Sequence, residues 1–516
     1  MNTVKIGKNI IDLLTSGMYE NPFCVYREYI QNSVDQIDKA VEMGLLTDRN
    51  KGAIYINVNE DEKTVEIIDN ATGVSSAVAW DILTSIAASE KDKTKQRGFR
   101  GIGRLGGIAY CKELIFETSS HGEDVKTVIS WDAKELRSII SNQQNKSEAH
   151  EVAQGVINMQ TLPENKIEHY FKVKLKGVTN HRLLDLVELR NYLKMVAPIP
   201  IENKFILKEE IYSRFKSEQI SIDEYSIYVN TEQIYKPYNS DIYTLQNSVR
   251  KKFDDIFAIQ FEDFIIDGKR IAFGWYGIST QLQQIPSNNV FRGIRLRKGN
   301  IQIGDEHTLR RFFKDGRFHL YYVGEIHVIS DDIIPNGRRD YFDDTEQLIN
   351  FESQIRHFSN EVLHKITYDS ANIHTAQKKI ESYETLKNEY EDKAKNGGFV
   401  NKSELNEYKT KIDKQKDDAE KALKTIDRFR ERASTNEILN KILNKTIGTE
   451  SDDNSKKIAP PKIETKTAKI KWKTDSLSKL SRKEQKLVSE IFEVVRTILT
   501  PDLAQNLIDK ITEKLK

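Results

Sequence analysis

Cysteine, proline and long apolar runs are all scarce in this chain of 516 residues. It has two cysteines, Cys24 and Cys111, which argues against a disulfide framework or a cysteine-rich zinc site and favours a reducing compartment. No apolar run approaches the roughly 18 residues that a membrane-spanning helix needs. The charged N-terminal stretch MNTVKIGKNIIDLL also lacks the apolar core of a signal peptide. We therefore expect a soluble, cytoplasmic protein that does not contact a membrane.

An excess of charge of either sign is also absent. Lysine and arginine total 79 and aspartate and glutamate total 78, which gives a net charge of +1. This balance neither indicates nor excludes a polyanionic partner. The apolar fraction of 38% is sufficient for globular domains, and the length predicts roughly three of them.

Residues 1–195 mix helical and strand patterns. Apolar spacing predicts a short helix near Asn9–Ser16 and a longer helix through Pro22–Met43. Glu90–Gly107 is rich in glycine and basic residues with little periodicity, which predicts a mobile loop. Alternation predicts a strand pair at AIYINVNE and TVEIIDN, and further strands at KELIFETSS, VKTVISWD and YFKVKLKGV.

The rest of the chain divides by composition into four further segments. Residues 196–345 predict a second α/β unit, with strands at EYSIYVN, IFAIQFEDFII, RIAFGWYGI, VFRGIRLRKGN and LYYVGEIHVI. Residues 346–447 favour helix and are interrupted by AKNGGFVN, which predicts an antiparallel helical hairpin or coiled coil. Residues 448–474 are the best linker candidate. Residues 475–516 predict two short helices, with helix-start signals at Ser481 and Thr500, and a dimerisation or partner-binding role.

Glu28, Asn32 and Asp35 are the first candidate site residues. Their spacing of four and then three places them on one side of the predicted helix. Such a carboxylate can take a proton from an attacking water, and such an amide oxygen can ligate magnesium. Taken alone, the pattern is more typical of an ordinary polar helix surface than of a catalytic site. The other side of the helix carries the apolar residues Tyr29, Ile30, Val34 and Ile37.

Two later segments add groups that suit a nucleotide. Asp69 ends a predicted strand, where a buried carboxylate can accept a hydrogen bond from the exocyclic amine of adenine, and Gly73 allows close approach of the backbone. A simple hairpin turn is the alternative for this segment. The glycines Gly98, Gly101 and Gly103 precede a short apolar run, so their free N–H groups could hold phosphate. No Gly-Lys-Ser/Thr follows them, which excludes a Walker A loop.

In this order, the three elements resemble the Bergerat fold of the GHKL ATPases, which include gyrase, heat-shock-90 chaperones, histidine kinases and MutL. The chaperone motif RELISNSSDALDK is similar to REYIQNSVDQIDK here. The resemblance implies a two-layer α/β sandwich that binds ATP and Mg²⁺. It assigns Glu28 as general base, Asn32 as magnesium ligand and Asp69 as adenine anchor. The other nucleotide-binding residues that it implies are Asp35, Gly73, Ser89, Gly98, Gly101 and Gly103.

Two positions depart from the family pattern. The usual DxGxG has Ala71 at its first glycine, which could narrow the adenine pocket. The later strand has Phe171 where the family places a threonine, and phenylalanine cannot replace that hydroxyl. Weaker nucleotide binding than in the chaperones is therefore expected.

The second unit resembles the transducer-like middle domain of the same chaperones. VGEIHVISDDIIPNGRRDYF is similar to the stretch that ends that domain. The resemblance assigns Arg339, with Arg338 as its neighbour, to the γ-phosphate, where a guanidinium can offset developing charge. A surface Arg-Arg turn is the alternative.

Three functional hypotheses follow. The first is an ATP-gated clamp, most simply a homodimer, that acts on DNA or on a protein partner and is also similar to the MORC ATPases. Basic residues at Arg292–Lys298 and Lys466–Lys473 would touch phosphates in the DNA version, with solvated surface as the alternative. The second is a heat-shock-90-like chaperone, and the third is a module that binds ATP without hydrolysing it. A separate effector protein, as in antiviral defence, is a further partner left open.

Overall fold

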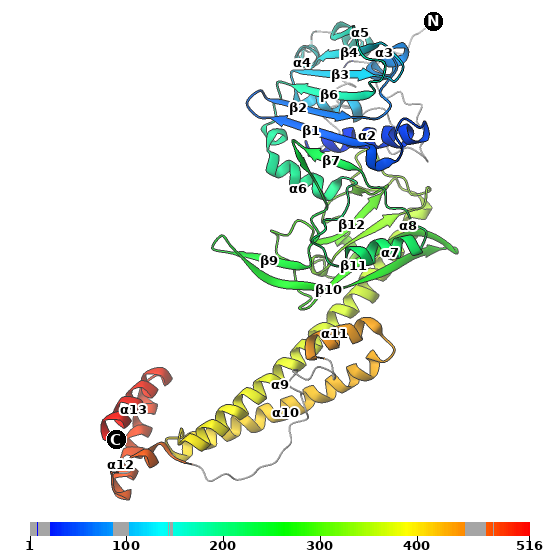
Figure 1. The fold of residues 1–516 in the computed structure, drawn as a ribbon. Coiled ribbons are helices and arrows are strands. Elements are labelled where there is room, and N and C mark those ends of the chain that lie inside the picture. Colours follow the sequence, from blue (N-terminus) through cyan, green and yellow to red (C-terminus); the bar gives the residue numbers. More distant parts are fainter. Residues whose placement is uncertain are drawn as a thin grey trace. The chain divides into compact units, whose positions relative to one another are not determined.

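The structure is a computed structural model that describes residues 8, 21–85, 103–142, 144, 148–448, 471–477 and 479–516. It consists of two compact units, Met1–Leu363 and His364–Lys516. The first unit contains two β-sheets with helices, and the second is helical (Figure 1). No helix in the described ranges is long and apolar enough to cross a membrane. A mixed α/β fold followed by a long helical region is therefore confirmed.

The first sheet has eight strands in the order β5-β4-β3-β6-β2-β1-β7-β8. All neighbours are antiparallel except β1 and β7. The five strands predicted in residues 1–195 are all present, and β5 joins them. The eight strands of the sheet are β1 Ala53–Asn59, β2 Thr64–Asp69, β3 Glu113–Ser119, β4 Val125–Asp132, β5 Ile157–Pro163, β6 Tyr170–Lys176, β7 Ser226–Val229 and β8 Glu232–Gln233.

Helices bury one side of this sheet in the main hydrophobic core. The predicted long helix is α2 (Cys24–Glu42), whereas the helix predicted near Asn9–Ser16 lies outside the described residues. The other helices of this region are α3 (Ser76–Thr84), α4 (Ala133–Ser141), α5 (Ala149–Gly155) and α6 (Leu186–Val196), with short 3-10 turns η1 (Arg49–Lys51), η2 (Gly103–Tyr110) and η3 (His181–Leu184). The prediction of a loop through Gly107 is wrong from Gly103 onward, because these residues form η2.

The second sheet has six strands in the order β13-β12-β14-β11-β10-β9. Four of the five strands predicted for this region belong to it. The strand predicted at EYSIYVN is β7, and it pairs with β1 of the first sheet instead, so the first sheet takes in residues well beyond 195. Bounds are β9 Asp241–Gln246, β10 Val249–Ile266, β11 Lys269–Ser279, β12 Gly293–Lys298, β13 Ile301–Ile303 and β14 Val323–Val328, with helices α7 (Lys208–Ser217), α8 (Glu346–His357), η4 (Arg310–Phe312), η5 (Phe318–Tyr321) and the π-helix η6 (Phe358–Leu363).

The second unit is built on a helical hairpin of α9 (His364–Asn396) and α10 (Lys402–Ala433), against which α11 (Glu437–Ile447) packs (Figure 1). The break predicted at AKNGGFVN is confirmed as the tip of the hairpin. There Phe399 pairs with Trp472 before η7 (Lys473–Ser476), α12 (Arg482–Ile498) and α13 (Pro501–Leu515). The predicted capping box is present, since Ser481 N–H donates to Glu484 at 2.6 Å.

One sequence prediction is contradicted by burial. Arg295 and Arg297 were candidates for contact with phosphates, but they are only 3% and 0% exposed. Both point into the second sheet, where Arg295 donates to the carbonyl of Val290 at 2.7 Å. A cation that is bonded inside a core cannot reach a nucleic acid. Of the second basic segment, residues 466–470 lie outside the described ranges.

Candidate nucleotide site

The orientation of α2 follows from its apolar face. Tyr29, Ile30, Val34 and Ile37 are at most 2% exposed and pack in the core of the first sheet. Glu28 and Asn32 are half-buried on the other side of the helix, and Asp35 is enclosed at 6% exposure. The predicted division of the helix is therefore confirmed, although Asp35 lies deeper than its neighbours.

Asp69 ends β2 with its side chain enclosed, at 1% exposure. The Ser33 hydroxyl donates to Oδ2 of Asp69 at 2.6 Å, and the Ala71 N–H donates to Oδ1 at 3.1 Å. Burial raises the pKa of Asp69 to about 6, and these hydrogen bonds oppose that shift. Sequence reasoning missed Ser33, whose one signal was its place next to Asn32 on the same helix. Ser33 connects the adenine-anchor candidate directly to α2.

The two family departures are accommodated by the surrounding core. Ala71 has no positive φ, and its methyl group is fully buried among the core side chains. Phe171 stacks on Phe116 with ring centroids 6.0 Å apart, and its backbone hydrogen-bonds to Asp69. Beside Asp69, the hydroxyl that the structure provides is that of Ser33. Gly73 is required for another reason: its φ is +63°, and a Cβ there would lie 1.8 Å from the Ser119 carbonyl oxygen.

The last of the predicted phosphate glycines lies against Glu28. A Cβ on Gly103 would lie 2.5 Å from Oε2 of Glu28, so the backbone of Gly103 lies directly against this carboxylate. Tyr29 fixes this contact, because its hydroxyl donates to the Arg104 carbonyl at 2.9 Å and accepts from the Gly107 N–H at 3.2 Å. The structure thus brings η2 and α2 together at Glu28. Ser89, Gly98 and Gly101 lie outside the described residues.

A turn from the second sheet region contacts Arg27, the neighbour of Glu28 on α2. Arg339 sits in this turn with a φ of 55° and 6% exposure, and its carbonyl accepts from Gly304 at 2.9 Å. A terminal nitrogen of Arg27 lies 3.2 Å from Oε1 of Glu28 and donates to the Arg338 carbonyl at 2.9 Å. One buried guanidinium therefore joins Glu28 to the residue next to Arg339. Sequence reasoning missed Arg27, because Arg338 lies 311 positions further along the chain and leaves no local signal.

These residues fit ATP with Mg²⁺. Asp69 offers a buried acceptor, Gly103 leaves bare backbone beside Glu28, and Asn32 offers an amide oxygen on the same helix face. In the described part of the chain, no group of three or more histidine, cysteine, aspartate or glutamate side chains could hold a metal. Magnesium is usually held by one or two protein oxygens together with phosphates and water, so a site with Asn32 as ligand suits it.

No protein-family model matches the chain. Several curated bacterial proteins do, over part of their length. The chaperone protein HtpG of Fusobacterium nucleatum is 25% identical over 228 residues, which is 40% of this chain and 37% of that protein. HtpG of Psychrobacter arcticus is 28% identical over 139 residues, or 24% of this chain and 21% of that protein.

A shorter match has higher identity. HtpG of Aliarcobacter butzleri is 35% identical over 94 residues, or 17% of this chain and 14% of that protein. The chain thus spans well under half the length of each of these relatives. The partial homologies therefore show a distant similarity to heat-shock-90-type chaperones, at the level of the superfamily.

Proposed function

We propose that this chain binds ATP with Mg²⁺, hydrolyses it, and uses the cycle to close and reopen a homodimeric, chaperone-like clamp on a protein partner. The observation that carries the proposal is the convergence on Glu28. Gly103 from η2 and Arg27 from α2 both lie against this carboxylate, and the same Arg27 nitrogen donates to the Arg338 carbonyl of the second sheet region. A site assembled from both sheet regions can respond to their relative movement.

Each residue then has a defined role. Glu28 accepts the proton of the attacking water, and Arg27 holds its carboxylate in place. Asp69, fixed by Ser33, accepts a hydrogen bond from the adenine amine. Asn32 would help to hold Mg²⁺, which when bound would offset the phosphate charge. Arg339 neutralises charge that develops on the transferred phosphoryl group.

The partner is proposed to be a polypeptide, for two reasons. The basic residues that favoured DNA include Arg295 and Arg297, which are buried. The relatives that match are named as chaperones. The similarity to the MORC ATPases stays a prediction from the sequence. The need for a separate effector protein likewise stays an open prediction.

The test is phosphate release by the purified chain as a function of protein concentration, followed by aggregation of an unfolding reporter protein with and without ATP. We expect the specific rate to rise with concentration as dimers form, and ATP to change the suppression of aggregation. Binding of ATP without phosphate release would rule out the hydrolysing clamp and leave the hypothesis of a module that binds ATP without hydrolysing it. Salt-sensitive DNA binding without an effect on aggregation would favour the DNA clamp.

Arg339 is expected to affect turnover more than nucleotide binding. Arg339→Ala should lower kcat by about 100-fold, because the guanidinium would act on charge that develops in the transition state. The dissociation constant for ADP should change by less than about threefold, since ADP lacks the γ-phosphate. Arg317→Ala is the control, because Arg317 is exposed and paired only locally with Asp315. An equal loss of ADP affinity and turnover would mean that Arg339 stabilises the fold and does not act on the phosphoryl group. A lower Tm of the variant would show this directly.

Nucleotide affinity is expected to weaken as the pH falls through about 6, where Asp69 takes up a proton. The protonated carboxyl loses the charge that attracts the adenine amine, so the decrease should approach at most about tenfold per pH unit. The free protein responds in the opposite sense: the contribution of Asp69 to its stability is greatest below the ordinary pKa of 3.8 and is lost as the pH rises through about 6. Calorimetric titration with ADP across this range measures the affinity. Asp69→Asn should bind weakly without this trend, and an unchanged trend in that variant would implicate another group.

A further inference from the structure

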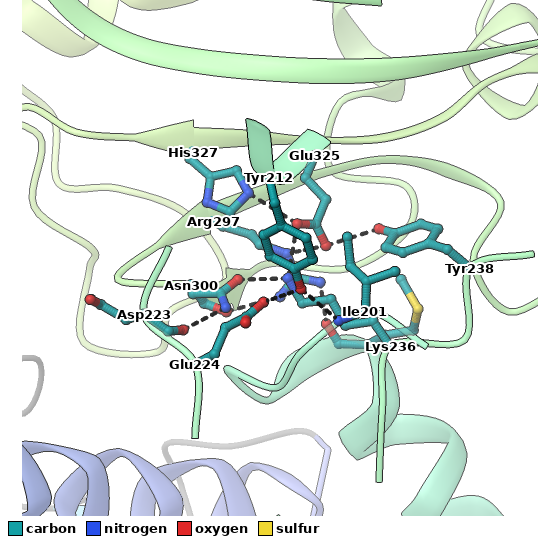
Figure 2. Close-up of polar contacts among 11 residues, drawn as sticks. Ile201, Tyr212, Asp223, Glu224, Lys236, Tyr238, Arg297, Asn300, Glu325 and His327 are labelled. Atoms are coloured by element: carbon teal, nitrogen blue, oxygen red, sulfur yellow. Dashed lines mark hydrogen bonds and ion pairs between the residues drawn. The ribbon is translucent and has the colours of Figure 1, made fainter. Parts of the chain in front are cut away.

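A buried set of charged and polar side chains lies where the two sheet regions of the first unit meet. We call it the junction cluster: Lys236, Tyr238, Arg297, Asn300, Glu325 and His327 (Figure 2). Glu325 on β14 lies at its centre, with Oε1 2.6 Å from Arg297 Nε and Oε2 2.9 Å from Lys236 Nζ. Tyr238 donates to Oε1 at 3.0 Å, and His327 Nε2 lies 3.0 Å from Oε2.

The junction cluster joins segments that lie far apart in the sequence. Lys236 follows β8 of the first sheet, whereas Arg297 and Glu325 lie on β12 and β14 of the second. Arg297 also donates to the Met195 carbonyl near the end of α6, at 2.8 Å. With Lys236, Arg297 and Glu325 at most 1% exposed, no water can replace these partners. The cluster therefore holds the segments that connect the two sheets in one arrangement.

A continuous line of polar contacts runs from this cluster to α2. Lys236 Nζ donates to Asn300 Oδ1 at 2.6 Å, and Asn300 Nδ2 donates to the Asp223 carbonyl at 2.6 Å. The Asp223 carboxylate accepts from Arg49 NH1 at 2.7 Å. Arg49 Nε in turn donates to Asp38 on α2 at 2.7 Å.

Asp38 lies on α2, the same helix as Glu28 and Asn32. It is three residues beyond Asp35, and a rigid helix carries a rotation or shift at one turn to the next. Tyr225, the residue just before β7, also contacts Asp38: its hydroxyl lies 2.8 Å from each carboxylate oxygen and donates to them. Asp38 is therefore held by two groups from outside α2, and one of them leads to the junction cluster.

We propose that Arg49 and Asp223 are positioning residues that fix α2, and with it Glu28, relative to the second sheet region. This rests on the proposed ATPase function. The Arg27–Arg338 contact sets α2 near its start, and the Asp38–Arg49–Asp223 contacts set it near its end. Core packing holds α2 on the first sheet, and these two polar contacts, one near each end, relate its direction to the second sheet region. The side chains of Arg49, Asp38 and Asp223 are 40%, 20% and 21% exposed, so these ion pairs contribute little to folding.

The experiment uses the full chain with Arg49→Met, which removes both ion pairs and keeps the aliphatic stem. We expect kcat to fall about fivefold to tenfold, with an unchanged dissociation constant for ADP and an unchanged Tm. Arg49→Lys should recover part of the rate, because one ammonium can satisfy only one of the two carboxylates. Asp223→Asn combined with Arg49→Met should be no slower than Arg49→Met alone, since both act through one contact. Arg214→Met is the matched control, because its guanidinium is similarly exposed, at 47%, and is paired with Glu218.

An unchanged kcat in Arg49→Met, or fully additive losses in the double variant, would overturn the positioning role. Hydrogen–deuterium exchange without nucleotide separates this inference from the ATPase proposal. Arg49→Met should speed exchange in peptides of α2 while leaving α7 unaffected. If the wild-type chain releases no phosphate, the function fails but the exchange result still decides whether these contacts hold α2. Unchanged exchange in α2 would reject the positioning role whatever the ATPase result.

Discussion

Replacing Glu28 with alanine is expected to lower kcat for ATP hydrolysis by about 100- to 10,000-fold, the range typical of a general base. The carboxylate is half-buried beside Gly103 and is held by Arg27 at 3.2 Å, so it is fixed next to the segment that would cradle phosphate. Asn32, the candidate residue one turn further along this face of α2, does not offer the same chemistry, because an amide is a poor proton acceptor. Phosphate release measured against ADP affinity reports the effect, and the affinity should be nearly unchanged.

Two variants make this result specific. Glu28→Gln keeps the shape of the side chain and an acceptor for Arg27, so it should lose turnover with little change in Tm. Glu42→Ala removes an exposed carboxylate at the far end of the same helix and should behave as wild type. If Glu28→Ala kept more than about a tenth of the wild-type rate, the proton would have another acceptor and the assignment of Glu28 would be wrong.

Replacing Glu325 with alanine is expected to have the largest effect on stability, a loss of about 3–5 kcal/mol in the free energy of unfolding of the second sheet region. Glu325 is the carboxylate that compensates both Lys236 and Arg297, and all three side chains are at most 1% exposed. Its two cationic neighbours hold the pKa of Glu325 well below its usual value against the opposing effect of burial. Removing it takes away the carboxylate that both enclosed cations share, and with it the ion pair of Arg297.

The measurement is hydrogen–deuterium exchange at increasing urea, read on peptides of β11, β12 and β14. Peptide resolution is needed because a chain of several units need not unfold in one step. Glu218→Ala is the control: Glu218 pairs with Arg270 at 2.7 Å, but it is 21% exposed, so we expect a loss below about 1 kcal/mol. A similarly small loss for Glu325→Ala would mean that water or another acidic group replaces it.

Part of the site could be predicted from local sequence. Helical periodicity alone placed Glu28 and Asn32 opposite the buried face formed by residues such as Ile30 and Val34. Strand alternation placed Asp69 at the end of β2, and the glycine pair in AKNGGFVN marked the tip of the α9–α10 hairpin. These features depend on neighbours within a few residues, so the sequence pattern contains them.

Contacts between distant segments could not be predicted in this way. The same basic pattern that suggested a phosphate surface places Arg295 and Arg297 inside the second sheet, because burial depends on which strands flank β12. The strand β7 was recognisable from its alternation, but its pairing with β1 was not, since alternation does not specify a partner strand.

The sequence by itself therefore determined the elements and the chemical types at the site: a carboxylate and an amide on one helix face, a carboxylate at a strand end, and glycines before a short helix. The tertiary structure alone decided that Ser33 bonds to Asp69, that Gly103 meets Glu28, and that Arg27 reaches the Arg338 carbonyl. It also decided that an unbroken series of hydrogen bonds and ion pairs links Asp38 on α2 to Glu325 on β14. The physical reason is that periodicity records which side of an element is buried, whereas hydrogen bonds and ion pairs depend on distances that only the packed chain fixes.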